Sequence, residues 1–109
     1  MFRLYVLKCE TIPVETDDIM EWREFFDGDG RLKKGTRMGD AYISTVFLGI
    51  DHSGNLEGPP ILFETKIFGG DYDGLIERYD TWAEALEGHK RIRKSLKVTK
   101  WDLLLLYTK

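Results

Sequence analysis

Alternating apolar and polar positions predict strands in two parts of the chain. Residues 2–9 alternate and are rich in strand-forming side chains, which predicts a first strand. Residues 41–50 are dense in β-branched and aromatic side chains, with Ile43, Thr45 and Phe47 on one face. We expect a central strand that is covered on both sides in its second half. The opposite face carries Val46, Leu48 and Ile50.

Two further strands are predicted after this central one. Residues 61–68 alternate clearly, and residues 74–79 alternate more weakly. Turn-rich loops join the segments, so an antiparallel meander is the simplest topology. Residues 31–39 are polar and basic, which is typical of a loop or a short edge strand. Pro13 is expected to interrupt any continuation of the first strand.

A long helix is predicted to begin at Thr81. Thr81 and Glu84 have the spacing of a capping box, and the helix is expected to extend to about residue 96. Gly88 lies inside this helix, where glycine costs about 1 kcal/mol relative to alanine. Close packing of the helix on the sheet is the expected reason for it. The expected apolar stripe consists of Trp82, Ala85, Leu86, His89, Ile92 and Leu96.

A shorter helix is predicted nearer the N-terminus. Asp17 or Asp18 is expected to cap it, with Glu21 in the capping-box position after Asp18. The helix is expected to end in the glycine-containing residues 27–30. Its expected apolar face consists of Ile19, Trp22 and Phe26.

These elements predict a single α+β domain over residues 1–109. We expect an antiparallel β-sheet of three to five strands with the capped second helix packed on one face. The short N-terminal helix is expected to cover the other face or an edge. The tail, residues 98–107, fits either a strand or a helix, and we favour a strand.

Composition changes this picture little. The chain is 42% hydrophobic and 32% charged, which is typical of a globular protein. Its single cysteine excludes an intramolecular disulfide. We expect no signal peptide, no membrane segment and no cofactor, and therefore a cytoplasmic protein.

Charge is distributed unevenly. The formal net charge is −3, yet residues 10–30 hold eight acids and one base, whereas residues 89–101 hold six bases and no acid. Such asymmetry indicates either partner surfaces or solvated helix faces. The candidate acidic partner surface consists of Asp17, Asp18, Glu21 and Glu24.

The centre of the chain carries a set of short motifs. They are STVFLGIDH at residues 44–52, GPPILFET at 58–65, FGG at 68–70, RYDTWAEA at 78–85 and GH at 88–89. With these motifs, residues 43–90 resemble a family of small bacteriophage and prophage proteins without an established function. The resemblance implies a phage or prophage origin and a place in the cytoplasm of the bacterial host. The family has an apolar residue where this chain has Lys66, so we expect a more solvated second face of that strand here.

Five polar residues in this central block form a candidate cluster. They are Asp51, His52, Glu64, Arg78 and His89. Histidine and carboxylate side chains bind divalent metals and transfer protons, so the candidates for such a site are His52, His89, Glu64 and Asp51. Their spacing matches no known ligand motif. A structural role is the alternative for each residue: Asp51 and His52 in a turn, Glu64 paired with Arg78 across two strands, and His89 half-buried.

Three functions remain open at this stage. The leading one is a non-enzymatic accessory that binds a macromolecule, with the acidic surface engaging a basic host protein as an inhibitor. The second is a small metal-binding protein or metal-dependent enzyme that uses Asp51, His52, Glu64 and His89. The third is a homo-oligomeric module in which residues 101–107 pair edge to edge. Nucleic-acid binding is not favoured because the pI is about 5.4; its candidate residues are Lys90, Arg91, Arg93, Lys94 and Lys97.

Overall fold

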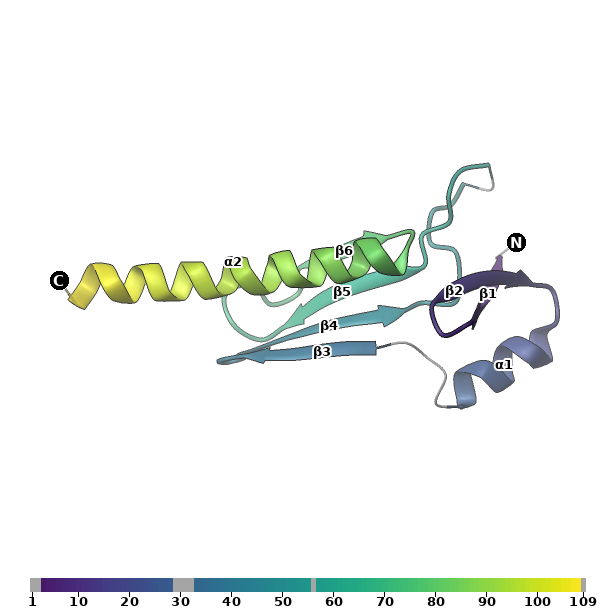
Figure 1. Ribbon diagram of the computed structural model, residues 1–109, viewed down its shortest axis with the longest axis horizontal. Helices are drawn as coiled ribbons and strands as arrows, with labels where there is room; N and C mark the ends of the chain where they lie inside the picture. Colours follow the sequence, from purple (N-terminus) through teal and green to yellow (C-terminus); the bar gives the residue numbers. More distant parts are fainter. Residues whose placement is uncertain (1–2, 29–32, 56, 109) are drawn as a thin grey trace.

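The computed structural model describes residues 3–28, 33–55 and 57–108, and for residues 97–108 it describes the backbone alone. Two antiparallel sheets and two helices make up this part of the chain (Figure 1). In chain order the elements are β1 (Leu4–Lys8), β2 (Ile12–Thr16), α1 (Ile19–Asp27), β3 (Lys33–Met38), β4 (Ala41–Phe47), β5 (Phe63–Phe68), β6 (Ile76–Tyr79) and α2 (Trp82–Thr108).

The predicted α+β architecture is confirmed. Strands β3, β4, β5 and β6 form an antiparallel meander in that order, and the segment predicted as a loop or edge strand is the edge strand β3. Helix α2 lies along one face of this sheet and contacts all four strands (Figure 1). The separate two-stranded sheet formed by β1 and β2 was not predicted.

One face of the four-stranded sheet is buried and the other is open. Ile43, Thr45 and Phe47 of β4 lie on the buried face and are fully inaccessible to solvent. Val46 and Leu48 on the opposite side are half-buried. The expectation of cover on both sides is therefore wrong, because both described helices pack elsewhere and leave this face to solvent.

Helix α2 packs on the buried face through one stripe of side chains. Ala85, His89, Ile92 and Leu96 are buried as expected, whereas Leu86 is 37% exposed and does not belong to the buried stripe. The role of Gly88 is also confirmed. A Cβ atom at Gly88 would lie only 2.5 Å from Cζ of Tyr79, so glycine allows the helix to approach β6 closely.

The prediction of a strand in the tail is wrong. Helix α2 continues without interruption to Thr108, well past the end predicted for it. No glycine or proline interrupts the chain after Gly88, and the four leucines at residues 103–106 have high helix propensity. Figure 1 shows the C-terminal part of α2 extending beyond the sheet.

The N-terminal hairpin corrects a second prediction. Pro13 does not end the sheet here, because it lies within β2 opposite Leu7 of β1. Proline is tolerated on the edge of a sheet, where its missing N–H leaves no neighbouring carbonyl without a donor. Backbone hydrogen bonds from Tyr5 N to Gly49 O (2.8 Å) and from Asp51 N to Arg3 O (3.0 Å) join β1 to the segment after β4.

Helix α1 packs under this hairpin. Asp18 caps it, as one of two expected alternatives, by accepting hydrogen bonds from the amides of Met20 and Glu21. Trp22 and Phe26 face the core as predicted, but Ile19 is 64% exposed and was assigned wrongly.

Gly49 is the point where α1 meets the end of β4. The indole Nε1 of Trp22 donates a hydrogen bond to Gly49 O at 3.0 Å. Gly49 has a φ of +75°, and a Cβ atom there would overlap the ring of Phe26. Both features restrict this position to glycine.

We predict that Gly49→Ala destabilises the protein more than Gly54→Ala. Both glycines have a positive φ, so both alanines incur a backbone cost of about 1–2 kcal/mol. Gly54 has open space where its Cβ would lie, whereas the overlap at Gly49 adds about 1–3 kcal/mol. Urea unfolding measures both losses, and the extra loss should disappear in a Phe26→Ala background. Equal losses for the two glycines would contradict the packing role of Phe26.

Candidate functional site

A row of hydrogen-bonded polar side chains crosses the interface between α2 and the sheet. His89 is 1% exposed. Its Nδ1 lies 2.7 Å from Oγ1 of Thr45, and its Nε2 lies 2.8 Å from Oγ1 of Thr36. The hydroxyls of Thr45 and Thr65 are 2.6 Å apart, and the hydroxyl of Tyr79 donates to Thr65 at 3.1 Å. Five residues from α2 and all four strands are thus linked.

One arrangement of hydrogens satisfies the whole row. Tyr79 donates to Thr65, Thr65 donates to Thr45, and Thr45 donates to Nδ1 of His89. Nε2 of His89 then carries the ring proton and donates it to Thr36. Burial raises the pKa of Tyr79, so its hydroxyl remains a donor at neutral pH. Among the described residues every buried side-chain nitrogen and oxygen has a partner.

His89 is neutral in this setting. Burial lowers the pKa of its imidazole, and the positive charges of Lys34 and Arg93 lower it further. Both ring nitrogens are already bonded to threonine hydroxyls. The side chain therefore has neither a free lone pair for a metal nor access to a substrate, and its role is to hold α2 on the sheet.

Asp51 is a structural anchor at the end of β4. Its carboxylate accepts hydrogen bonds from the amides of Ser53 (2.8 Å) and Ile61 (2.9 Å) and forms an ion pair with Arg3. Burial acts to raise the pKa of Asp51, but the two amides and Arg3 outweigh it and hold the pKa well below the usual value. The turn role expected for Asp51 is confirmed, and Arg3 is an additional partner that was not predicted.

Glu64 and Arg78 form the expected cross-strand pair. They are directly opposite each other in β5 and β6, and Nε of Arg78 lies 2.9 Å from Oε2 of Glu64. Both lie on the open face of the sheet, because Thr65 next to Glu64 lies on the face that α2 covers. The sheet therefore separates Glu64 from His89.

His52 lies in the turn after β4, as its structural alternative predicted. It is exposed, and its Nδ1 lies 2.7 Å from the backbone carbonyl oxygen of Ile50 in the same turn. The four candidate metal ligands consequently occupy separate environments. Among the described residues, no three His, Cys, Asp or Glu side chains come together as a metal site.

A pocket of about 250 Å³ opens between α2 and the β5–β6 connection. Glu77 and Arg91 form an ion pair at this pocket, and hydrogen bonding to Arg91 lowers the pKa of Glu77. Its volume falls below the range of about 300–1,000 Å³ that is usual for small-molecule sites. A carboxylate held ionised by a guanidinium is a weak general base, so the pocket does not suggest catalysis. The other lining residues are Ile67, Tyr72, Leu75, Ile92, Ser95 and Leu96.

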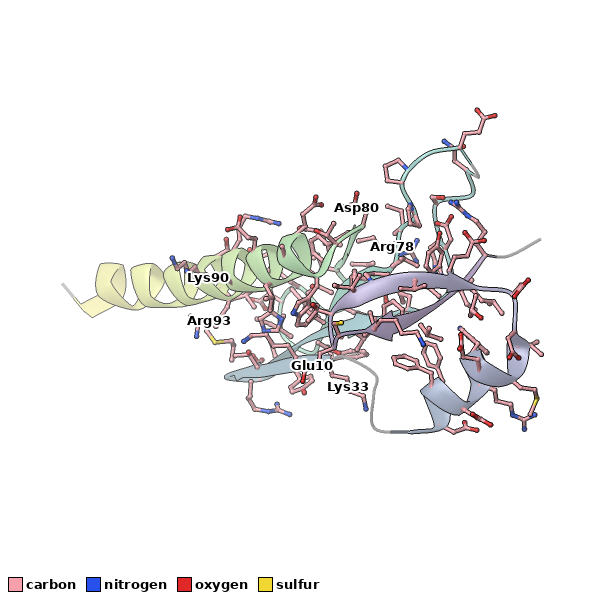
Figure 2. All side chains as sticks on the ribbon, turned by 45° about the vertical axis from the view of Figure 1, so that its right-hand side comes forward. Glu10, Lys33, Arg78, Asp80, Lys90 and Arg93 are labelled. Carbon is pink, nitrogen blue, oxygen red and sulfur yellow. The ribbon has the colours of Figure 1, made fainter. Side chains whose placement is uncertain are left out.

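The charged residues predicted on the helices have different surroundings. Asp17, Asp18, Glu21 and Glu24 are all exposed, although Asp18 caps α1 and Glu21 lies 3.8 Å from Lys8. On α2, Arg91 is paired with Glu77, and the side chain of Lys97 lies outside the described part. In Figure 2 the side chains of Lys90 and Arg93 leave α2 in different directions.

Sequence reasoning missed the partners of His89. Thr45 was placed on the correct face of its strand, but it was taken as a member of an apolar face. The available signal was their chemistry: two threonines at core positions of adjacent strands and a histidine on the apolar side of a helix all need partners.

No protein-family model, curated protein or solved structure matches this chain. The resemblance to phage and prophage proteins therefore remains a prediction.

We predict that His89 makes stability depend on pH. Burial lowers the pKa of His89 in the folded state but not in the unfolded chain. Its contribution to the free energy of unfolding is therefore complete above about pH 6.5 and decreases as the pH is lowered further. The contribution has a slope of at most about 1.4 kcal/mol per pH unit. Urea unfolding of wild type and His89→Gln between about pH 7 and pH 5 measures it. The variant should be less stable at pH 7 and should show a flatter pH dependence, while parallel curves would contradict the assignment. His52→Gln, which removes an exposed imidazole, is the matched control.

We also predict that Asp51→Asn lowers the free energy of unfolding by about 2–3 kcal/mol at pH 7, because a charged acceptor of three groups is lost. The depressed pKa of Asp51 stabilises the fold above about pH 4, and this contribution is lost as the pH falls further. The gap between wild type and variant should therefore narrow in acid. Asp73→Asn, which weakens one exposed hydrogen bond to the Gly69 amide, should cost less than about 1 kcal/mol. A constant gap at all pH values would argue against an ionised anchor.

Proposed function

We propose that this protein is a phage- or prophage-associated accessory that acts in the host cytoplasm by binding a macromolecule and not by catalysis. The observation that carries the proposal is an acidic surface with exposed apolar side chains, formed by the β1–β2 hairpin and α1. A surface of this kind is typical of protein-binding sites.

The candidate catalytic residues support a non-enzymatic role. Asp51, Glu64 and His89 each bond to structural partners and lie in three different places. The pocket of about 250 Å³ between α2 and the β5–β6 connection presents an ion pair and apolar groups instead of an acid, a base and a nucleophile. The metal-dependent alternative has no site to which these residues converge.

The hairpin contributes apolar groups to the proposed surface. Ile12 and Val14 of β2 are 54% and 40% exposed. They are paired with Lys8 and Val6, so they lie on the same hairpin face as Lys8, whose ammonium is near Glu21 of α1. These two residues therefore flank the acidic helix.

Helix α1 contributes both charge and further apolar area. Ile19 and Met20 are exposed in its first turn. The acids Asp17, Glu21 and Glu24 are also exposed. Carboxylates interleaved with apolar groups favour a partner with basic and apolar side chains, such as the nucleic-acid-binding surface of a host protein. Occupying that surface would inhibit the host protein.

The structure does not contain the strand on which the homo-oligomeric alternative depends. Residues 101–107 belong to α2, so they do not pair edge to edge as a strand in this structure. The described helices also contain no segment that is long and apolar enough to cross a membrane.

The proposal predicts that charge reversal on α1 abolishes partner capture. Asp17→Lys, Glu21→Lys and Glu24→Lys are combined, while Asp18 is kept because it caps the helix. Immobilised wild-type protein should retain a basic protein from a host lysate, and the variant should not. Lys90→Glu with Lys94→Glu on α2 is the control and should retain the partner. Capture by the α1 variant, or loss in the α2 control, would refute the assignment to this surface; circular dichroism verifies folding.

A further inference from the structure

The open face of the four-stranded sheet carries a pattern that the proposed function does not use. Cross-strand pairing places alternate residues of the four strands on this face. The face consists of Lys33, Gly35, Arg37, Tyr42, Ser44, Val46, Glu64, Lys66, Phe68, Ile76 and Arg78. Neither described helix packs on it, and Lys33 points away from α2 (Figure 2).

Two aromatic rings lie next to each other on this face. Tyr42 and Phe68 are directly opposite in β4 and β5 and are 38% and 48% exposed. A Cβ atom at Gly35 would overlap the tip of the Tyr42 ring, so glycine lets this side chain lie across the edge strand. Exposed neighbouring rings on an open sheet provide a platform for stacking.

Each ring has its own cation. The guanidinium of Arg37 lies 5.7 Å from the centroid of Tyr42, and Nζ of Lys66 lies 5.1 Å from the centroid of Phe68. Each cation lies over its ring, so a planar group that stacks there would take the place of the cation on the ring and have the positive charge beside it. This combination of ring and adjacent cation fits a nucleobase together with its phosphate.

The charge of the face is opposite to that of the whole chain. Its charged residues are four cations, Lys33, Arg37, Lys66 and Arg78, and one anion, Glu64, which give a net charge of +3. The chain as a whole has a net charge of −3. A polyanion is therefore complementary to this face, while face-to-face pairing of two copies would bring like charges together.

The aromatic pair is also remote from the acidic part of the molecule. Phe47 and Phe63, at the other end of β4 and β5, contact the hairpin and α1. Tyr42 and Phe68 lie at the opposite ends of the same strands. The acids of α1 thus lie beyond one end of the sheet, and the stacking platform is near the other.

We propose that this open sheet face binds single-stranded nucleic acid. Bases stack on Tyr42 and Phe68, and Arg37 and Lys66 contact the phosphates. A duplex is excluded from this mode, because its bases are stacked on each other and do not present their faces to a sheet. The site is separate from the acidic surface, so each proposal stands or falls by its own experiment.

The test measures binding of labelled oligothymidylate and oligouridylate, roughly ten nucleotides long, by fluorescence anisotropy. Tyr42→Ala and Phe68→Ala should each weaken binding roughly five- to a hundred-fold. Tyr72→Ala removes an equally exposed aromatic side chain from the loop before β6 and should leave binding unchanged. Arg37→Gln and Lys66→Gln should each lower the slope of log K against the logarithm of the salt concentration by the contribution of about one phosphate contact.

Four binding results, and a fifth result from light scattering, would overturn the proposal. These are no binding of either oligomer by wild type at about 50 mM salt, equal binding of a duplex, equal losses in Tyr72→Ala, or retention of affinity in both Tyr42→Ala and Phe68→Ala. Light scattering completes the experiment. A wild-type dimer that Tyr42→Ala and Phe68→Ala convert to a monomer would assign the face to a second copy of the chain instead.

Discussion

The close approach of α2 to the sheet at Gly88 is the constraint on which the rest of the structure depends. A side chain at this position would collide with Tyr79, so the helix axis would have to move outward. Moving outward would separate His89 from Thr45 and Thr36 and leave buried polar groups without partners. The cost of glycine in a helix is about 1 kcal/mol, which is smaller than the cost of such a loss.

The row of polar residues around His89 divides the core into two apolar clusters. One cluster, around Phe47 and Phe63, includes the hairpin and the start of α2. The other, around Ile43 and Ile67, includes Ile92 and Leu96 near the middle of the helix. Hydrogen bonds have stricter directions than apolar contacts, so the polar row sets the register of the helix along the sheet. The side chains on the buried face of the sheet therefore stabilise the fold, and a partner can bind only at the surfaces that α2 does not cover.

Local patterns were enough to predict the elements of the meander, the N-terminal caps of both helices and the pair Glu64–Arg78. These features depend on spacing within one element or on neighbouring strands. The ion pair of Asp51 with Arg3 could not be predicted in this way, because it joins residues 48 positions apart. The hairpin is local, but it was missed because Pro13 was expected to interrupt the sheet, whereas it lies within β2. The tail was mistaken for a strand because a short apolar run has no period that distinguishes the two structures. The open face escaped notice for a related reason: its aromatic and basic residues are scattered along the sequence and meet only through cross-strand register.

The attachment of the hairpin to the segment after β4 has a consequence for the order in which the chain folds. Tyr5 and Leu7 are buried against Phe47 and Phe63, which leave the ribosome much later than the hairpin does. A two-stranded ribbon is at best marginally stable by itself. The first part of the protein to be synthesised can therefore be buried only after the central strands have been made.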